Sequence, residues 1–202
     1  MTIFDRITEA QKLLGKDRKQ AQTPEEKELY LLAIDALWFV WMNGQSYEFE
    51  SYRKDVESKA PPRVIASFNT RDEAEAWLGA QPEPPDLADV LIADEYHVIM
   101  SSRDRSRRLL VPDSGLEYHI EEMTKDGLPP AVATFNTREE ADAWFGSQTA
   151  PPAQTVIQIG GERYLAVFYR NINHRALFPF SVVERLHARR KRREQEGTEE
   201  GE

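Results

Sequence analysis

The chain of 202 residues is 40% apolar and 30% charged and has a net charge of −9, a composition typical of globular protein. It contains no cysteine, which excludes disulfides, thiolate nucleophiles and cysteine-ligated zinc and favours a cytoplasmic location. Its first residues lack the basic-then-apolar order of a secretory leader, and the longest apolar run, residues 29–42, contains Asp35 and is too short to span a membrane. We therefore expect no membrane contact.

Residues 1–58 are predicted to form a helical region. Thr23 and Glu26 have the spacing of a capping box, in which each side chain accepts an N–H of the other residue, and Pro24 suits the first helical position. Asn43-Gly44 is a typical helix end, because glycine readily takes the left-handed conformation found there. The sequence thus predicts a helix between these two signals.

The predicted helix carries the run LYLLAIDALWFVWM, which is apolar on nearly every face. Such a helix lies either in the core of its own chain or in a contact with another subunit. The sequence leaves both interpretations open. In the second case, a homo-oligomer contact is expected at the aromatic residues Trp38, Phe39 and Trp41.

The next part of the chain contains an internal duplication. Residues 62–112 align without a gap over residues 129–179, with about twenty identities. Each copy reads as strand, helix, strand and strand, with a capping-box signature before the helix and a double proline after it. Period-two alternation places Val90 and Ile92, and the aligned Ile157 and Ile159, on the helix-covered face.

We therefore predict an α+β fold with an N-terminal helical region followed by two tandem βαββ repeats with small antiparallel sheets. The expected parts of the chain are as follows: residues 1–58, the helical region; 59–112, the first repeat; 113–127, an acidic connector; 128–180, the second repeat; and 181–202, a basic helix with an acidic disordered tail.

The candidate binding site is a pair of arginine-flanked loops. The segment RDRSRR at residues 103–108 aligns with RNINHR at residues 170–175, so both copies keep their first and last arginine. A guanidinium group is suited to binding a carboxylate or a phosphate. Alternatively, these arginines form ion pairs with acidic residues of their own repeat, such as Glu73 or Glu140. The candidate binding residues are Arg103, Arg105, Arg108, Arg170, Asn171 and Arg175.

Patterns for catalysis are missing from the sequence. The four histidines lack the HExxH spacing, and there is neither a GxSxG motif nor a phosphate-binding glycine loop. His97 is explained by a polar surface hairpin, and Glu117 with His119 by a solvated connector. We expect a protein that is not an enzyme, with no catalytic residue, no cofactor and no metal site.

The negative charge is concentrated in the first two thirds of the chain, most densely in residues 113–127, which have five acidic residues and one lysine. A broad negative field repels nucleic acid and favours a basic protein partner. A basic cluster near the end of the chain offers a nucleic-acid contact as a less favoured alternative. It consists of Arg189, Arg190, Lys191, Arg192 and Arg193.

The phrase FNTREEADAW, followed by a hairpin, resembles small bacterial modules of the peptidoglycan-associated SPOR type, in which a strand leads into a helix through a polar turn. The likeness covers the first half of each repeat. The whole chain resembles uncharacterised duplicated βαββ proteins of bacteria, some of which are labelled phage head proteins. The second resemblance implies a structural role in a virion.

The leading functional hypothesis is a non-enzymatic cytoplasmic protein-binding module, of the immunity or antitoxin kind, that engages a basic partner. A first alternative is a phage-derived head or assembly protein, associated with the virion, whose apolar second helix makes subunit contacts. A second alternative is a nucleic-acid-binding protein that uses the arginine loops and the basic tail.

Overall fold

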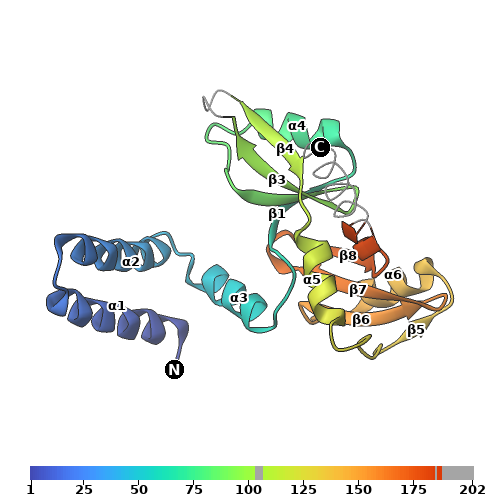
Figure 1. Ribbon diagram of the computed structural model, residues 1–202, viewed down its shortest axis with the longest axis horizontal. Helices are drawn as coiled ribbons and strands as arrows, with labels where there is room; N and C mark the ends of the chain where they lie inside the picture. The colour runs from blue at the N-terminus through green and yellow to red at the C-terminus, as the bar shows by residue number, and fades with distance from the viewer. Residues whose placement is uncertain (103–106, 185, 188–202) are drawn as a thin grey trace, which may run out of the picture. The chain divides into compact units, whose positions relative to one another are not determined.

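The computed structural model of the chain describes residues 1–102, 107–184 and 186–187 (Figure 1). The chain divides into two compact units, Met1–Glu57 and Ser58–Glu202. The first unit is helical, and the second contains both sequence repeats.

The first unit consists of the helices α1 (Ile3–Gln20), α2 (Pro24–Met42) and α3 (Ser46–Glu57). The predicted capping box is present, because the Thr23 hydroxyl accepts the Glu26 N–H at 3.1 Å and the Glu26 carboxylate accepts the Thr23 N–H at 3.2 Å. Gly44 has the left-handed φ of 69° that was expected after the helix end. The α1 and α2 helices pack against each other, with the rings of Phe4 and Trp41 5.9 Å apart.

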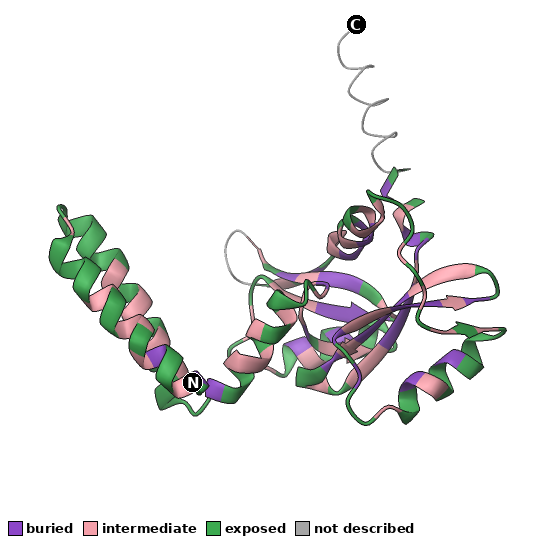
Figure 2. Ribbon diagram, turned by 90° about the horizontal axis from the view of Figure 1, so that it is seen from below, coloured by how far each residue is buried: buried purple, intermediate pink, exposed green. Residues whose placement is uncertain are grey.

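This helical unit has a very small core. Among its described residues, the buried apolar side chains are Ile3 and Ile7, and α2 has no buried residue at all. Figure 2 shows the contrast, because the long N-terminal helices are mostly coloured as exposed while the strands carry most of the buried residues. Within its own unit, the apolar helix is therefore not buried in a core.

The second unit contains two four-stranded sheets and the helices that accompany them. The elements of the first repeat are β1 (Val64–Phe68), α4 (Arg71–Gly79), β2 (Ala88–Ile92), β3 (Glu95–Ser101) and β4 (Arg108–Pro112). Those of the second are β5 (Thr134–Phe135), α6 (Arg138–Ser147), β6 (Gln154–Ile159), β7 (Glu162–Tyr169), the 3₁₀ turn η1 (Arg170–Ile172) and β8 (His174–Pro179). Helix α5 (Gly115–Thr124) lies between the repeats in the chain. The α+β class, with helices first and a duplicated sheet after them, is confirmed.

The sheets differ from the prediction in the direction of their first strand. The strand orders are β1-β2-β3-β4 and β5-β6-β7-β8, and the first pair in each is parallel while the others are antiparallel. The sheets are therefore mixed rather than antiparallel. The physical reason is that a helix connects the first two strands, and such a crossover returns the chain to the same end of the sheet. The final short strand also pairs in both copies, which makes each repeat βαβββ.

The predicted alternation along β2 and β6 is confirmed. In the first repeat, Val90 and Ile92 pack with Ala74 and Leu78 of α4. The equivalent residues of the second repeat pack in the same way; these are Ile157, Ile159, Ala141 and Phe145. Each repeat therefore has one sheet face covered by its own helix.

The opposite faces of the two sheets form one shared core. Leu91, which alternation turns away from α4, clusters with Leu165 and Phe178 of the second sheet. Leu116 and Ile120 of α5 belong to the same cluster. The two repeats are thus halves of one packed body rather than two independent domains.

The β2–β3 hairpin turns through Ala93 and Asp94, whose φ values of 49° and 59° are left-handed. The equivalent turn of the second repeat uses Gly160 and Gly161, as predicted, with φ of 56° and 94°. A side chain with a Cβ atom is strained in this conformation. Part of the stability of the first hairpin is therefore offset by strain at Ala93.

Replacing Ala93 by glycine is expected to raise the free energy of unfolding by about 0.5–1 kcal/mol, because glycine takes a positive φ without strain. Urea denaturation of the full chain measures the difference. Ala88→Gly, at the first residue of β2, is the matched control and is expected to lower the free energy of unfolding. A loss of stability in the Ala93→Gly variant would contradict the inference that Ala93 is strained.

Candidate functional site

The predicted arginine residues lie in different surroundings. Arg108 begins β4, while Arg170 and Asn171 lie in η1. Arg103 and Arg105 fall outside the described residues. The described members of the two predicted loops therefore lie in different kinds of element.

Arg175 is engaged inside the second repeat. Its Nη2 atom donates to the backbone oxygen of Gln148 at 2.9 Å, and its guanidinium carbon lies 4.7 Å from the ring centroid of Phe168. Stacking of this kind is a cation–π contact. The hydrogen-bond partner is thus a backbone carbonyl rather than the expected carboxylate, since Glu140 caps its helix instead.

Asn171 connects the two repeats. Its Nδ2 atom donates to the backbone oxygen of Val64 in β1 at 2.6 Å, so η1 of the second repeat is bonded to the first strand of the first. The role of Asn171 is therefore to join the repeats.

Two buried tyrosines strengthen the same junction. The hydroxyls of Tyr96 and Tyr169 are 2.5 Å apart, and the Tyr96 hydroxyl donates to the backbone oxygen of Pro62 at 2.8 Å. Burial raises the pKa of both hydroxyls, so both remain protonated donors. The alignment of the repeats places Arg163 opposite Tyr96 and Ser102 opposite Tyr169. The sequence signal for this junction is that two tyrosine positions are not conserved between the repeats, and the prediction did not include it.

The hairpin tip of the first repeat reaches the second repeat through its carboxylate. Asp94 Oδ2 lies 3.5 Å from Arg138 Nη2, and Asp94 Oδ1 lies 3.5 Å from His174 Nε2. Arg138 is the first residue of α6, and His174 is the first residue of β8. Arg138 at the start of α6 and His174 at the start of β8 therefore contact the same carboxylate. None of these contacts was predicted.

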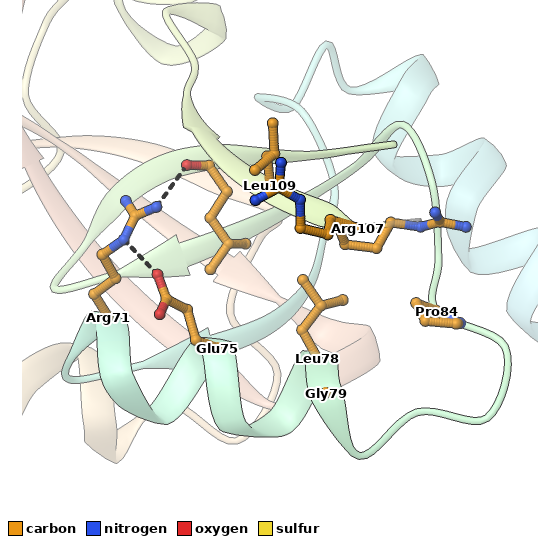
Figure 3. A pocket seen from close by; sticks show the side chains of 9 residues that line it. Arg71, Glu75, Leu78, Gly79, Pro84, Arg107 and Leu109 are labelled. Atoms are coloured by element: carbon orange, nitrogen blue, oxygen red, sulfur yellow. Dashed lines mark hydrogen bonds and ion pairs between the residues drawn. The ribbon is translucent and has the colours of Figure 1, made fainter. Parts of the chain in front are cut away.

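The corresponding place in the first repeat is an open pocket of about 560 Å³ (Figure 3). Arg71 and Glu75 of α4 lie at one end, and Arg107 extends toward Pro84 at the other. The remaining lining residues are Leu78, Gly79, Arg108, Leu109 and Leu110. The sequence pointed to Arg108 but not to Arg71 or Arg107.

Arg71 is partly engaged by its own repeat. Its Nε atom is 2.7 Å from the Glu75 carboxylate, and its Nη2 atom donates to the backbone oxygen of Leu110 at 3.1 Å. Arg108 has a buried Nε atom that finds no acceptor within the described part of the chain. The lining therefore contains three arginines and one carboxylate, and its electrostatic potential favours an anion.

The connector between the repeats is not solvated, which corrects the interpretation of Glu117 and His119. Glu117 is 6% exposed and lies in α5, whose apolar side packs into the shared core. His119 Nε2 lies 2.9 Å from Gln154 Oε1, and burial lowers the pKa of His119. Leu116 and Ile120 explain the burial, because their spacing gives α5 an apolar face.

His97 is also buried rather than on a polar surface, with its Nδ1 atom 3.1 Å from the Glu95 backbone oxygen. Within the described ranges, no three or more histidine and acidic side chains are grouped to hold a metal ion. Across the same residues, no helix has the length and apolar character needed to cross a bilayer.

The first unit offers a second surface, along α2. Its large apolar side chains are exposed over much of the helix, including Leu29 at 67% and Phe39 at 62%. The other members are Leu32, Trp38, Trp41 and Met42. Of the residues predicted for a homo-oligomer contact, Phe39 is the most exposed, whereas the ring of Trp41 packs against Phe4 of α1.

Comparisons of the chain with protein-family models, curated proteins and solved structures give no significant match. The resemblances to phage head proteins and to SPOR modules remain expectations from sequence.

The carboxyl group of Asp89 has its pKa raised to about 6, chiefly by burial and further by the charge of Asp113. This value lies above the 3.8 of an unperturbed aspartate, so the folded state binds the proton more tightly than the unfolded state. The contribution of this group to stability is accordingly fully present below pH 4 and is lost as the pH rises through about 6.

We expect Asp89→Asn to be more stable than the parent protein at pH 7.5, by about 1 kcal/mol once the partial exposure of the group is taken into account. The difference should vanish near pH 4. Urea denaturation at both pH values measures it, with Asp126→Asn, an exposed aspartate, as the control. A less stable Asp89→Asn variant at pH 7.5 would show instead that the carboxylate makes favourable contacts.

Proposed function

We propose that this protein is a non-enzymatic protein-binding module whose N-terminal unit joins two copies of the chain. The observation that carries the proposal is the exposed apolar seam of α2. We define this seam as Leu29, Leu32, Ala36 and Phe39, all of which are exposed.

The seam has the spacing of a coiled-coil contact. Its members are separated by three, four and three residues, which is the a-and-d pattern of two heptads. The half-buried Tyr30, Ile34 and Leu37 recur on the other side of the helix, where α1 packs. The α2 helix therefore has two apolar sides, of which α1 covers one.

The small size of the helical unit supports a partner that covers the exposed side of α2. A unit as short as Met1–Glu57 is marginally stable by itself, and this one buries few apolar side chains. Covering one large apolar side chain contributes about 1.5–3 kcal/mol. Three such residues on each copy would give the helical unit the core that it lacks.

The occupant that fits the seam is a second copy in antiparallel orientation. The first turn of α2 is acidic, with Glu25 and Glu26, whereas its last turn carries no charge. Antiparallel pairing places each acidic turn against an uncharged one, while parallel pairing would oppose like charges. The resulting contact is the same surface on both copies, as a two-fold dimer requires.

The other proposals have less support. A role in immunity or as an antitoxin, with a basic partner, is supported by the net charge of −9. A role in phage assembly is supported by the same seam as the present proposal, since assembly also needs subunit contacts. Nucleic-acid binding through the tail depends on residues 189–193, which lie outside the described residues.

Size-exclusion chromatography with light scattering, over a range of protein concentrations, tests the proposal. The expected mass is twice the 23.3 kDa of one chain at high concentration. Phe39→Glu should shift the protein to the monomer, because a charge in the seam would be buried without a partner.

Leu128→Glu is the matched control. Leu128 is 67% exposed, which matches the exposure of Leu29 in the seam, and it lies in the other unit. Circular dichroism confirms that both variants keep their helical content. A monomer at every concentration, or equal dissociation by both substitutions, would contradict the proposal.

A further inference from the structure

The first sheet leaves part of one face uncovered. Ile99 of β3 and Leu110 of β4 pack with α4, so the residues that alternate with them point to the other side of the sheet. Cross-strand pairing joins these residues into one surface. Leu109 is 48% exposed there, and Met100 is 40% exposed. We call this surface the open face and define it as Asp89, Val98, Met100, Leu109 and Val111.

The same face is buried in the second repeat. The aligned residues all belong to the shared core, and none is more than 8% exposed; they are Val156, Leu165, Val167, Ala176 and Phe178. Leu116 and Ile120, on the apolar side of α5, pack in the same cluster. The second repeat therefore shows that an amphipathic helix is the kind of element that covers this face of the sheet.

The chain has no further apolar segment beside the first repeat to cover the open face. Residues 182–187 align with the start of α5, but Val182 packs into the shared core. Beyond them, residues 188–202 contain Ala188 and no larger apolar residue, and residues 103–106 contain none. The apolar side chains that are needed must therefore come from elsewhere.

The open face also carries a carboxylate. Asp89 stands where the second repeat has Val156, and it forms no hydrogen bond or ion pair with the residues that the structure describes. Burial and the charge of Asp113 raise the pKa of Asp89 to about 6, so the group is mostly ionised at pH 7.5. A cation held against Asp89 would offset this unfavourable charge.

We propose that the open face binds an amphipathic helix of a partner protein, with a lysine or arginine of that helix placed against Asp89. The apolar side of the helix covers Val98, Met100 and their neighbours, as α5 covers the aligned residues of the second repeat. Binding of this kind combines apolar anchors at helical spacing with one charged contact.

A second copy of this chain does not fit the open face. The seam of α2 contains no cation, and α5 has Glu117 on its buried side, so either helix would leave Asp89 without a partner. Two open faces would bring the same negative charge to both sides of the contact. The partner is therefore a different protein. This inference does not rest on dimer formation through α2, because the two surfaces lie in different units.

Titration of the full-length protein with helical peptides tests the proposal. The probe is the sequence of residues 113–127 with the substitution Glu117→Lys, and the reference peptide keeps Glu117. A staple between positions 118 and 122, both exposed in α5, holds each peptide helical. We expect the lysine peptide to bind about tenfold more tightly, which is typical of a hydrogen bond between charged groups, and to shift the NMR signals of Met100 and Val111.

Two substitutions in the protein separate the charged contact from the apolar one. Asp89→Asn is expected to remove the preference for the lysine peptide, while Asp126→Asn, an exposed aspartate outside the open face, should keep it. Leu109→Gln is expected to weaken binding of the lysine peptide by about tenfold, because an apolar contact is lost. Leu128→Gln, at an exposed leucine of the second repeat, is the matched control and should bind like the parent protein.

Equal binding of the two peptides to the parent protein, or an unchanged preference in Asp89→Asn, would overturn the proposal. So would NMR shifts confined to Leu165 and Ile120, which would show that the peptide displaces α5 from the second sheet. A change of oligomeric state in Leu109→Gln would also overturn it, because the open face would then be a contact between copies of this chain.

Discussion

Each four-stranded sheet of this protein has two apolar faces and one helix of its own to cover them. The helix covers the face that carries Val90 in the first repeat and Ile157 in the second. The other faces pack on each other and on α5, where Leu91 and Leu165 are fully buried. An uncovered sheet face would expose a large apolar area, and neither repeat can cover both faces of its own sheet by itself. The duplication is therefore a requirement of the fold.

The same packing makes the two repeats differ from each other, because corresponding residues have different neighbours in each. The junction needs residues that differ between copies, such as Tyr96 and Tyr169, and it brings Asp94 onto the second repeat. Arg138 and His174 of the second repeat thereby contact a carboxylate of the first. The aligned residues of the first repeat, Arg71 and Arg107, line an open pocket. In the helical unit, large apolar side chains are left exposed along α2.

Much of the fold was predictable because its signals are local. The capping box at Thr23, the glycine turn at Gly160 and the alternation through Val90 depend on neighbours in the chain, and all three are present in the structure. The parallel first strand and the burial of Glu117 were not predicted. These depend on which elements pack together, and periodicity reports an apolar face without naming what covers it.

The candidate site was predicted only in part for the same reason. The alignment of the repeats identified Arg108, which lines the pocket, and Asn171, which proves to join the repeats. It also contains the aligned pair Arg71 and Arg138, each with an acidic residue one turn later. The contact of Asp94 with His174 could not be found this way, because it joins residues that are not aligned with each other.

Because they share one core, the two repeats are expected to unfold as one cooperative body. Native-state hydrogen exchange of the full chain, with and without Leu165→Ala, tests it directly. The substitution removes a fully buried side chain of the second repeat and should cost about 2–5 kcal/mol. Amides of β3, in the first repeat, are expected to lose as much protection as those of β7. Loss of protection in the second repeat alone, with β3 unchanged, would contradict it.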